Sequence, residues 1–114
     1  MKQIRKVYGC PVELSLDLLG GKWKPVILAR LKDRPLAYGE LRRLLPTLSD
    51  KMLTERLKEL EDQGLVAREA MPGAAGRFQY RLTERGESLR PVLQALYEWG
   101  EVAARELSVL IKAA

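Results

Sequence analysis

The most constraining feature of this sequence is a pair of short amphipathic segments, residues 38–45 and 49–63, joined by a tight connection. Pro46 ends the first segment, because the residue before a proline is pushed away from helical geometry. Ser49 then caps a second helix, and Gly64 supplies its stop. Two helices joined by about four residues, the second with a polar outer face, predict a helix-turn-helix.

The second helix of this pair has an apolar stripe and a polar face. The stripe repeats at i, i+4 and i+7, which is typical of a buried side: Leu53, Leu57 and Leu60. A recognition helix places its N-terminal half near base edges in the major groove, and here that half carries the basic and small polar groups. We therefore predict that the exposed face of this helix contacts DNA through Lys51, Met52, Thr54, Glu55 and Lys58. The alternative is that this face is simply solvated.

A hairpin is predicted directly after this helix. Residues 65–69 have strand character, residues 71–76 are rich in Gly and Pro, and residues 77–82 alternate polar and apolar side chains. Two strands joined by such a loop make a wing. The dipeptide Leu36-Ala37 is too short to classify and could supply a further small strand.

Four other residues are predicted to approach the DNA. Ser49 is first a helix cap, and the exposed amides beside it suit a phosphate, since a helix N-terminus favours anions. Arg42 and Arg43 suit phosphate contacts, with simple solvation as the alternative. Arg77 suits a phosphate or minor-groove contact, because a wing flanks the duplex backbone.

The last helix is expected to run from Thr83 to Ile111, with a kink at Pro91. At about 1.5 Å per residue it would be roughly 42 Å long, whereas a domain of about 100 residues has a radius of gyration near 13 Å. Its apolar stripe therefore overhangs the core and needs a partner, which predicts a homodimer. The stripe includes Leu96, Trp99, Ala103 and Leu107.

Together these elements predict an α+β, mainly α fold: a winged helix-turn-helix with a two-stranded wing and N- and C-terminal dimerisation helices. We expect one domain over residues 1–114. Its parts are a helix-turn-helix over about 38–63, a wing over about 65–82, and dimerisation helices over about 11–19 and 83–111.

Composition excludes the enzyme mechanisms that need histidine and leaves open only chemistry by paired carboxylates, although the acids lie scattered among basic residues. The chain has no histidine and one cysteine, so a Ser-His-Asp or Cys-His arrangement and an ordinary structural zinc site are impossible. We predict no enzyme activity, no cofactor and no metal. A single cysteine and no membrane-spanning or signal segment predict a cytoplasmic protein that does not bind membranes. The net charge of +5 permits DNA binding, but the excess lies in residues 1–34, outside the predicted recognition helix.

Cys10 has two interpretations. A cysteine is often a small buried hydrophobe. This one precedes Pro11 at a helix start and follows Arg5 and Lys6, and both features favour the thiolate. A redox or electrophile sensor is the second interpretation, and with one cysteine an intrachain disulfide is impossible.

Several segments, which follow one another in the same order along the chain, resemble the HxlR family of bacterial transcription regulators. They are Cys10-Pro11-Val12-Glu13, Leu19-Gly20-Gly21-Lys22-Trp23, Gly39-Glu40-Leu41-Arg42-Arg43, Ser49-Asp50-Lys51-Met52-Leu53-Thr54 and Tyr80-Arg81-Leu82-Thr83. The resemblance implies a dimer that binds palindromic operators in double-stranded DNA. It also implies dimer contacts from the first helix, where Leu14 lies, and from the last. Members often sense electrophiles or oxidants through a cysteine at the position of Cys10.

The resulting hypothesis is a sequence-specific repressor that responds to a redox, electrophile or small-molecule signal. Two alternatives remain open. One is a protein-interaction module in which the recognition helix is merely solvated. The other is a MarR-like regulator with a ligand pocket between its dimerisation and DNA-binding parts.

Overall fold

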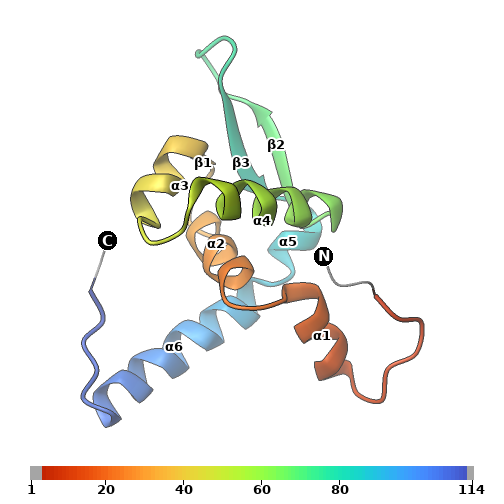
Figure 1. The fold of residues 1–114 in the computed structure, drawn as a ribbon, viewed down its shortest axis with the longest axis vertical. Coiled ribbons are helices and arrows are strands. Elements are labelled where there is room, and N and C mark those ends of the chain that lie inside the picture. Colours follow the sequence, from red (N-terminus) through yellow and green to blue (C-terminus); the bar gives the residue numbers. More distant parts are fainter. Residues whose placement is uncertain (1–3, 113–114) are drawn as a thin grey trace.

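The computed structural model describes residues 4–112 as six helices and three short strands (Figure 1). The predicted helix-turn-helix and two-stranded wing are confirmed, and Leu36-Ala37 does form a strand. The elements are α1 (Pro11–Leu19), α2 (Trp23–Leu31), β1 (Leu36–Ala37), α3 (Tyr38–Leu44), α4 (Asp50–Asp62), β2 (Val66–Ala70), β3 (Phe78–Leu82), α5 (Glu84–Glu87) and α6 (Arg90–Glu106). None of these helices is long and apolar enough to cross a bilayer.

The core lies where α2, α3 and α4 meet the sheet. The predicted stripe of α4 is buried: Leu53, Leu57 and Leu60 are each at most 1% exposed. Leucines of α2 and α3 close the same cluster with Leu36, Val66 and Leu82 from the strands. This packing fixes which face of α4 remains in solvent.

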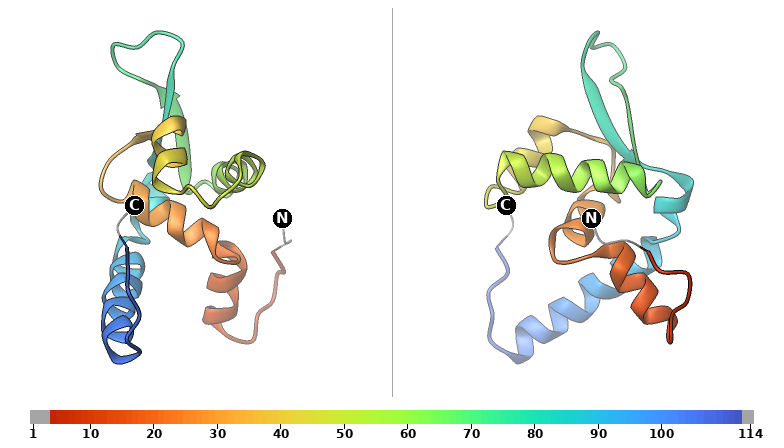
Figure 2. Two further views of the ribbon diagram at one scale, coloured as in Figure 1. Left: turned by 60° about the vertical axis from the view of Figure 1, so that its left-hand side comes forward. Right: turned by 45° about the vertical axis from the view of Figure 1, so that its right-hand side comes forward.

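The three strands form an antiparallel sheet in the order β1-β3-β2. In the register Val66 pairs with Leu82 and Ala70 with Phe78, so the hairpin extends well past the core. Figure 2 shows this hairpin projecting beyond α4. At the start of α3, the first helix of the helix-turn-helix, the N–H of the N-cap residue Ala37 donates to the Glu40 side chain at 2.9 Å. Hydrogen bonds from Arg34 and from this amide hold the pKa of Glu40 below its usual range.

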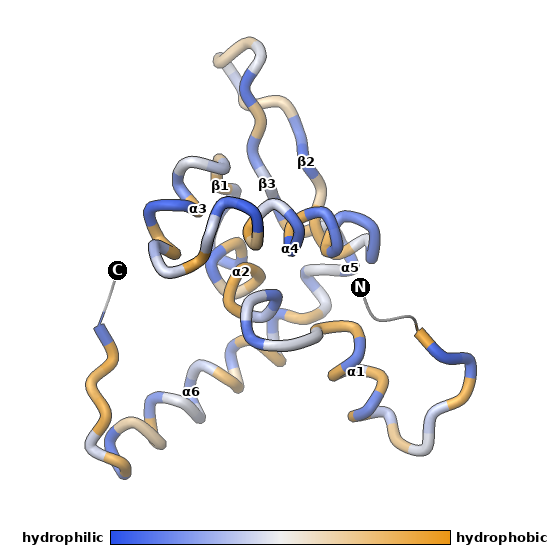
Figure 3. The backbone as a smooth tube through the Cα atoms, in the orientation of Figure 1, coloured by the Kyte–Doolittle hydropathy of each residue, from blue (hydrophilic) through white to orange (hydrophobic). Residues whose placement is uncertain are grey.

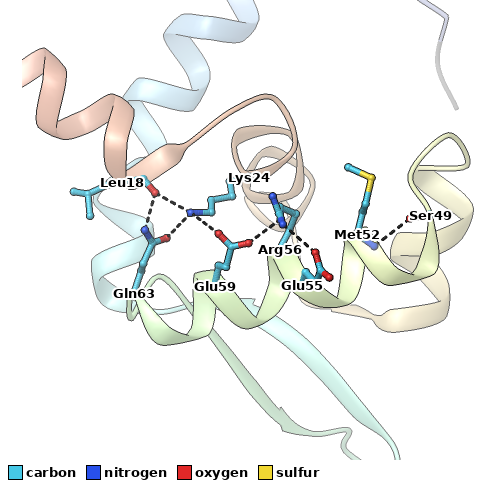
Figure 4. A network of polar contacts seen from close by, with 8 residues as sticks. All are labelled: Leu18, Lys24, Ser49, Met52, Glu55, Arg56, Glu59 and Gln63. Carbon is cyan, nitrogen blue, oxygen red and sulfur yellow. Dashed lines mark hydrogen bonds and ion pairs between the residues drawn. The ribbon is translucent and has the colours of Figure 1, made fainter. Parts of the chain in front are cut away.

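A buried polar network joins α4 to α2 and to the end of α1 (Figure 4). Lys24 is only 3% exposed, and its Nζ lies 3.2 Å from Glu59 Oε2 and 3.4 Å from Gln63 Oε1. Gln63 also donates to the Leu18 carbonyl at 2.8 Å. Glu59 contacts a second cation, because Arg56 Nε lies 2.9 Å from its Oε1, in an ion pair without hydrogen-bond geometry.

The predicted continuous helix over 83–111 is wrong in extent. Thr83 does cap a helix, accepting from the Gly86 N–H at 3.0 Å, but α5 ends at Glu87 and α6 begins at Arg90. Pro91 has no N–H to continue the earlier helix, so it stands in the first turn of a new one and not at a kink.

At its other end α6 stops at Glu106, five residues before the predicted end. Ser108 adopts a positive φ of 57°, and the Val109 N–H donates to the Ala104 carbonyl at 2.8 Å. This is a Schellman motif with serine where glycine is usual. The 17 residues of α6 therefore span roughly 25 Å, at about 1.5 Å per residue.

Gly86 is required by close packing of α5 on the start of the wing. A Cβ at this position would lie 2.1 Å from the Leu65 carbonyl oxygen, which is backbone and cannot move aside cheaply. The Thr83 hydroxyl donates to the Gly64 carbonyl at 2.6 Å in the same place. These contacts attach the wing's base to the segment that leads into α6.

The Lys24 network predicts an asymmetric effect on stability. Glu59→Ala should lower the free energy of unfolding by about 3 kcal/mol, because Lys24 would stay buried without an acid. Lys24→Met should cost less, because Glu59 would keep Arg56 as a partner. Urea unfolding at one fixed protein concentration measures both. An equal or smaller loss in Glu59→Ala would contradict this account of the network.

Candidate nucleic-acid interface

The exposed face of α4 carries two cations that other side chains leave available. Lys51 and Lys58 are exposed, and no ion pair among residues 4–112 involves either. Ser49 caps the helix by accepting from the Met52 N–H at 3.1 Å, so its hydroxyl is already used. Met52 itself is 39% exposed at the border of this face. The exposed face of α4 therefore offers Lys51 at the start of the helix, and Lys58 two turns further on, to a ligand.

Tyr38, which the sequence did not single out, connects α3 to this face. Its hydroxyl donates to the Asp50 carboxylate and lies 3.2 Å from Thr54 Oγ1. Burial raises the pKa of Tyr38, and the hydrogen bond to Asp50 raises it further. Thr54 thus lies against a tyrosine of the preceding helix, and its hydroxyl is held in place.

The other predicted residues of α4 and α3 differ in whether they have a partner within the chain, which the sequence did not indicate. Glu55 pairs with Arg56 at 3.2 Å, on the side of α4 that leads to the Lys24 network. Arg42 turns inward, donating to the Leu48 carbonyl and lying 3.4 Å from Asp50 Oδ1. Arg43 is exposed and has no ion pair within the part of the chain that is described. Arg42 therefore stabilises the turn, while Arg43 stays available to a phosphate.

Arg77 lies at the base of the wing loop, just before β3, and its side chain is exposed. Its backbone closes the loop, since its N–H donates to the Ala74 carbonyl at 3.1 Å and its carbonyl accepts from Met71 at 2.9 Å. The loop is thus ordered by its own backbone, and the Arg77 guanidinium extends from it.

Comparison with known proteins identifies this arrangement. The family described as HxlR-like helix-turn-helix matches residues 18–107. The chain belongs to the HxlR-like family. It is 45% identical over 95 residues to an uncharacterized HTH-type transcriptional regulator of Methanothermobacter thermautotrophicus, covering 83% of this chain and 72% of that protein.

Solved structures agree with the family assignment. The redox regulator HypR in its oxidized form is 41% identical, with a TM-score of 0.76 over 82% of this chain and 96% of that one. Quinone-bound YodB from B. subtilis is 38% identical, with a TM-score of 0.67 over 81% of this chain and 98% of that one. This HxlR-like protein is a winged-helix, DNA-binding transcriptional regulator. Its relatives are regulators and not enzymes, in agreement with the prediction.

Cys10 in this HxlR-like protein is the N-cap residue of α1 and is exposed, so it is not a buried packing residue in this chain. The segment before it folds back along the helix. The Tyr8 hydroxyl donates to Asp17 at 2.7 Å, and Arg5 pairs with Glu13 at 3.3 Å. Arg5 is therefore engaged by an acid of α1, which the sequence pattern did not indicate.

The HxlR-like chain also leaves large apolar side chains exposed on α1, on α6 and on the segment after α6, and Figure 3 shows where hydrophobic residues occur along these segments. Leu96, Trp99 and Leu107 are 54%, 74% and 72% exposed, and Ala103 is half-buried. Leu14 is half-buried on α1. The predicted dimerisation residues therefore lie at or near the surface, outside the core cluster. Trp23, by contrast, packs against the core.

Proposed function

We propose that this regulator is a homodimeric repressor that binds a palindromic operator and loses affinity when Cys10 is modified. The observation that carries the proposal is the exposed, unpaired cationic face of α4 beside a projecting wing. We expect it to act in the cytoplasm.

Support for DNA reading comes from the chemistry of α4 and the wing. Lys51 and Thr54 lie in the N-terminal half of the helix, which is the half that approaches base edges in this type of motif. Arg43 on α3 and Arg77 at the end of the wing loop are exposed cations, and such cations suit the phosphate backbone. Glu55 and Arg42 have partners within the chain and are weaker candidates.

Lys51→Ala should weaken binding to the operator more than binding to a random duplex, because base contacts give specificity and phosphate contacts only position the protein. Arg77→Ala should weaken both about equally and reduce the salt dependence by roughly one unit of slope per subunit. Fluorescence anisotropy over a salt series, with an operator selected from random duplexes, measures both. An unchanged operator preference in Lys51→Ala would mean that another face reads the DNA.

Support for assembly comes from the uncovered apolar residues of α6. The helix is shorter than the sequence suggested, but Leu96 and Trp99 still lie mostly in solvent. An apolar surface that extends over α6 and α1 is typical of a protein interface. A second copy of the same chain would cover it with equivalent residues, as in a two-fold dimer.

Leu96→Asp should dissociate the dimer at micromolar concentration, because it would bury a charge without a partner. Gln94→Asp is the matched control, since it adds the same charge to an exposed polar position of the same helix. Sedimentation velocity distinguishes the species. A wild-type monomer at that concentration, or an intact dimer in Leu96→Asp, would show that α6 does not form the interface.

Support for signal response comes from the position of Cys10. Its exposed thiol at the N-cap of α1 is accessible to reagents, and α1 belongs to the proposed dimer surface. The similar proteins HypR and YodB are described as a redox regulator and as a quinone-bound form. The Cys10 thiol would add across a ring C=C bond of a quinone, which forms one S–C bond, passes the thiol proton to the ring system and leaves it as a hydroquinone. Diamide would join two Cys10 thiols of a dimer and itself be reduced to the hydrazine.

Treatment with a quinone should reduce operator affinity of the wild type and leave Cys10→Ser unaffected, because an added group would displace α1 and change the spacing of the two recognition helices. Half-sites one DNA turn apart tolerate little change in that spacing. Diamide should act only if the two Cys10 Cα atoms come within about 7 Å. Equal loss of binding in both proteins, or none in either, would place the signal elsewhere.

One observation favours the small-molecule alternative. A pocket of about 220 Å³ lies between α1, the end of α4, and the α5–α6 junction, lined by four leucines and a valine together with polar residues that include Gln63 and Arg85. It is smaller than most ligand sites, which hold about 300–1,000 Å³. If an effector acts by binding in this pocket, the Cys10→Ser variant should respond to that effector in the same way as the wild type.

A further inference from the structure

The two faces of the wing differ in charge. Side chains alternate along β3, so Gln79 and Arg81 lie on one face with Glu69 of β2. Phe78, Tyr80 and Leu82 lie on the other, together with Val66, Arg68 and Ala70. We call the first set the outer face and the second the inner face.

The outer-face arginine is already neutralised. Arg81 Nε lies 2.7 Å from Glu69 Oε2, and Gln79 donates to the other carboxylate oxygen at 2.9 Å. These hydrogen bonds, from Gln79 first and Arg81 second, hold the pKa of Glu69 below its usual range. Glu69 therefore stays charged and paired with Arg81, and this face presents little net positive charge.

The inner-face arginine is held by aromatic rings. The Arg68 guanidinium carbon lies 4.8 Å from the centroid of Phe78, whose ring is 48% exposed. Burial raises the pKa of Tyr80, and Arg68 opposes that rise by its charge and by a hydrogen bond to the Tyr80 side chain. No acid forms an ion pair with Arg68 among residues 4–112. Stacking restricts the side chain while leaving N–H groups at its edge available to an anion.

The inner face of the wing is on the same side of the hairpin as the recognition helix α4. Val66 and Leu82, at its base, are buried in the same cluster as the leucines of α4. Glu61 of α4 is close enough to raise the pKa of Tyr80. Figures 1 and 2 show the hairpin rising from behind α4, so that the two elements form a corner. Arg68, Phe78 and the small Ala70 are the residues of this face that lie beyond the core.

We infer that Arg68, held over the Phe78 ring, binds a DNA phosphate in the corner between the recognition helix and the wing. A duplex that receives α4 in its major groove carries the bordering phosphate backbone past this corner. A planar guanidinium matches phosphate oxygens with two parallel hydrogen bonds. Phe78 is a positioning residue that acts through Arg68. The inference rests on the proposed binding of DNA by α4.

The test compares Arg68→Ala with Arg81→Ala, which removes the same charge from the opposite face of the same hairpin. Arg68→Ala should weaken binding to operator and random duplexes alike, by about tenfold, as expected when a charged hydrogen bond is removed. The slope of log affinity against log salt should fall by about 0.9 for each phosphate that the variant no longer neutralises. Arg81→Ala should leave both quantities close to wild type.

A second comparison isolates the role of Phe78. Phe78→Leu should weaken binding about threefold, because it removes the ring face, whereas Phe78→Tyr should bind like the wild type. The double variant Arg68→Ala/Phe78→Leu should bind no more weakly than Arg68→Ala alone. A further loss in the double variant would show that Phe78 acts independently of Arg68.

The outcomes separate this inference from the proposed function. Equal binding by Arg68→Ala and Arg81→Ala, in a protein whose wild type binds duplexes with the expected salt dependence, overturns the inference alone. A wild type without salt-dependent duplex binding overturns the proposed function. Thermal unfolding of each variant shows whether it is folded, and Arg68→Lys, which keeps the charge but loses the planar fork, provides a milder change at the same position.

Discussion

The ion pair between Lys24 and Glu59 is the interaction on which the placement of the recognition helix depends. An ammonium group that is almost fully removed from water is tolerated only when an acid and further acceptors surround it. Here those groups come from α4 and from the last turn of α1. The leucine stripe packs α4 against the core, but apolar packing is not directional. The polar network joins particular atoms and therefore fixes the position of α4 along its own axis.

The sequence predicted the elements whose signals are local. Ser49 and Thr83 stand where their hydroxyls cap helices, and the spacing of Leu53, Leu57 and Leu60 placed the buried side of α4 correctly. The end of α6 was not predictable, because Ser108 takes a left-handed conformation that serine seldom adopts. That the chain forms one domain, and that its first and last helices dimerise, remain predictions.

The candidate site was predictable in position and less so in detail. The sequence indicates which side chains of α4 face solvent, but it does not show which arginines have internal partners. Arg42 and Arg43 are adjacent and chemically identical, yet only Arg42 contacts the turn. Arg68 and Arg81 also differ, and the strand register decides which partner each one has. Arg68 of β2 lies across the hairpin from the Phe78 ring of β3, whereas Arg81 of β3 lies across from the Glu69 carboxylate of β2.

The shared Leu18 carbonyl gives α1 the mechanics of a lever. Lys24 of α2 and Gln63 at the C-cap of α4 both donate to this oxygen, at 3.5 Å and 2.8 Å, and therefore anchor one end of the helix to both elements. Gly20 and Gly21, both with positive φ, follow this anchor directly. Cys10 stands at the other end, roughly 13 Å away for nine helical residues. A rigid helix that pivots about its anchored end moves most at the opposite end, so in the proposed response a group attached to Cys10 would act with the longest arm that α1 offers.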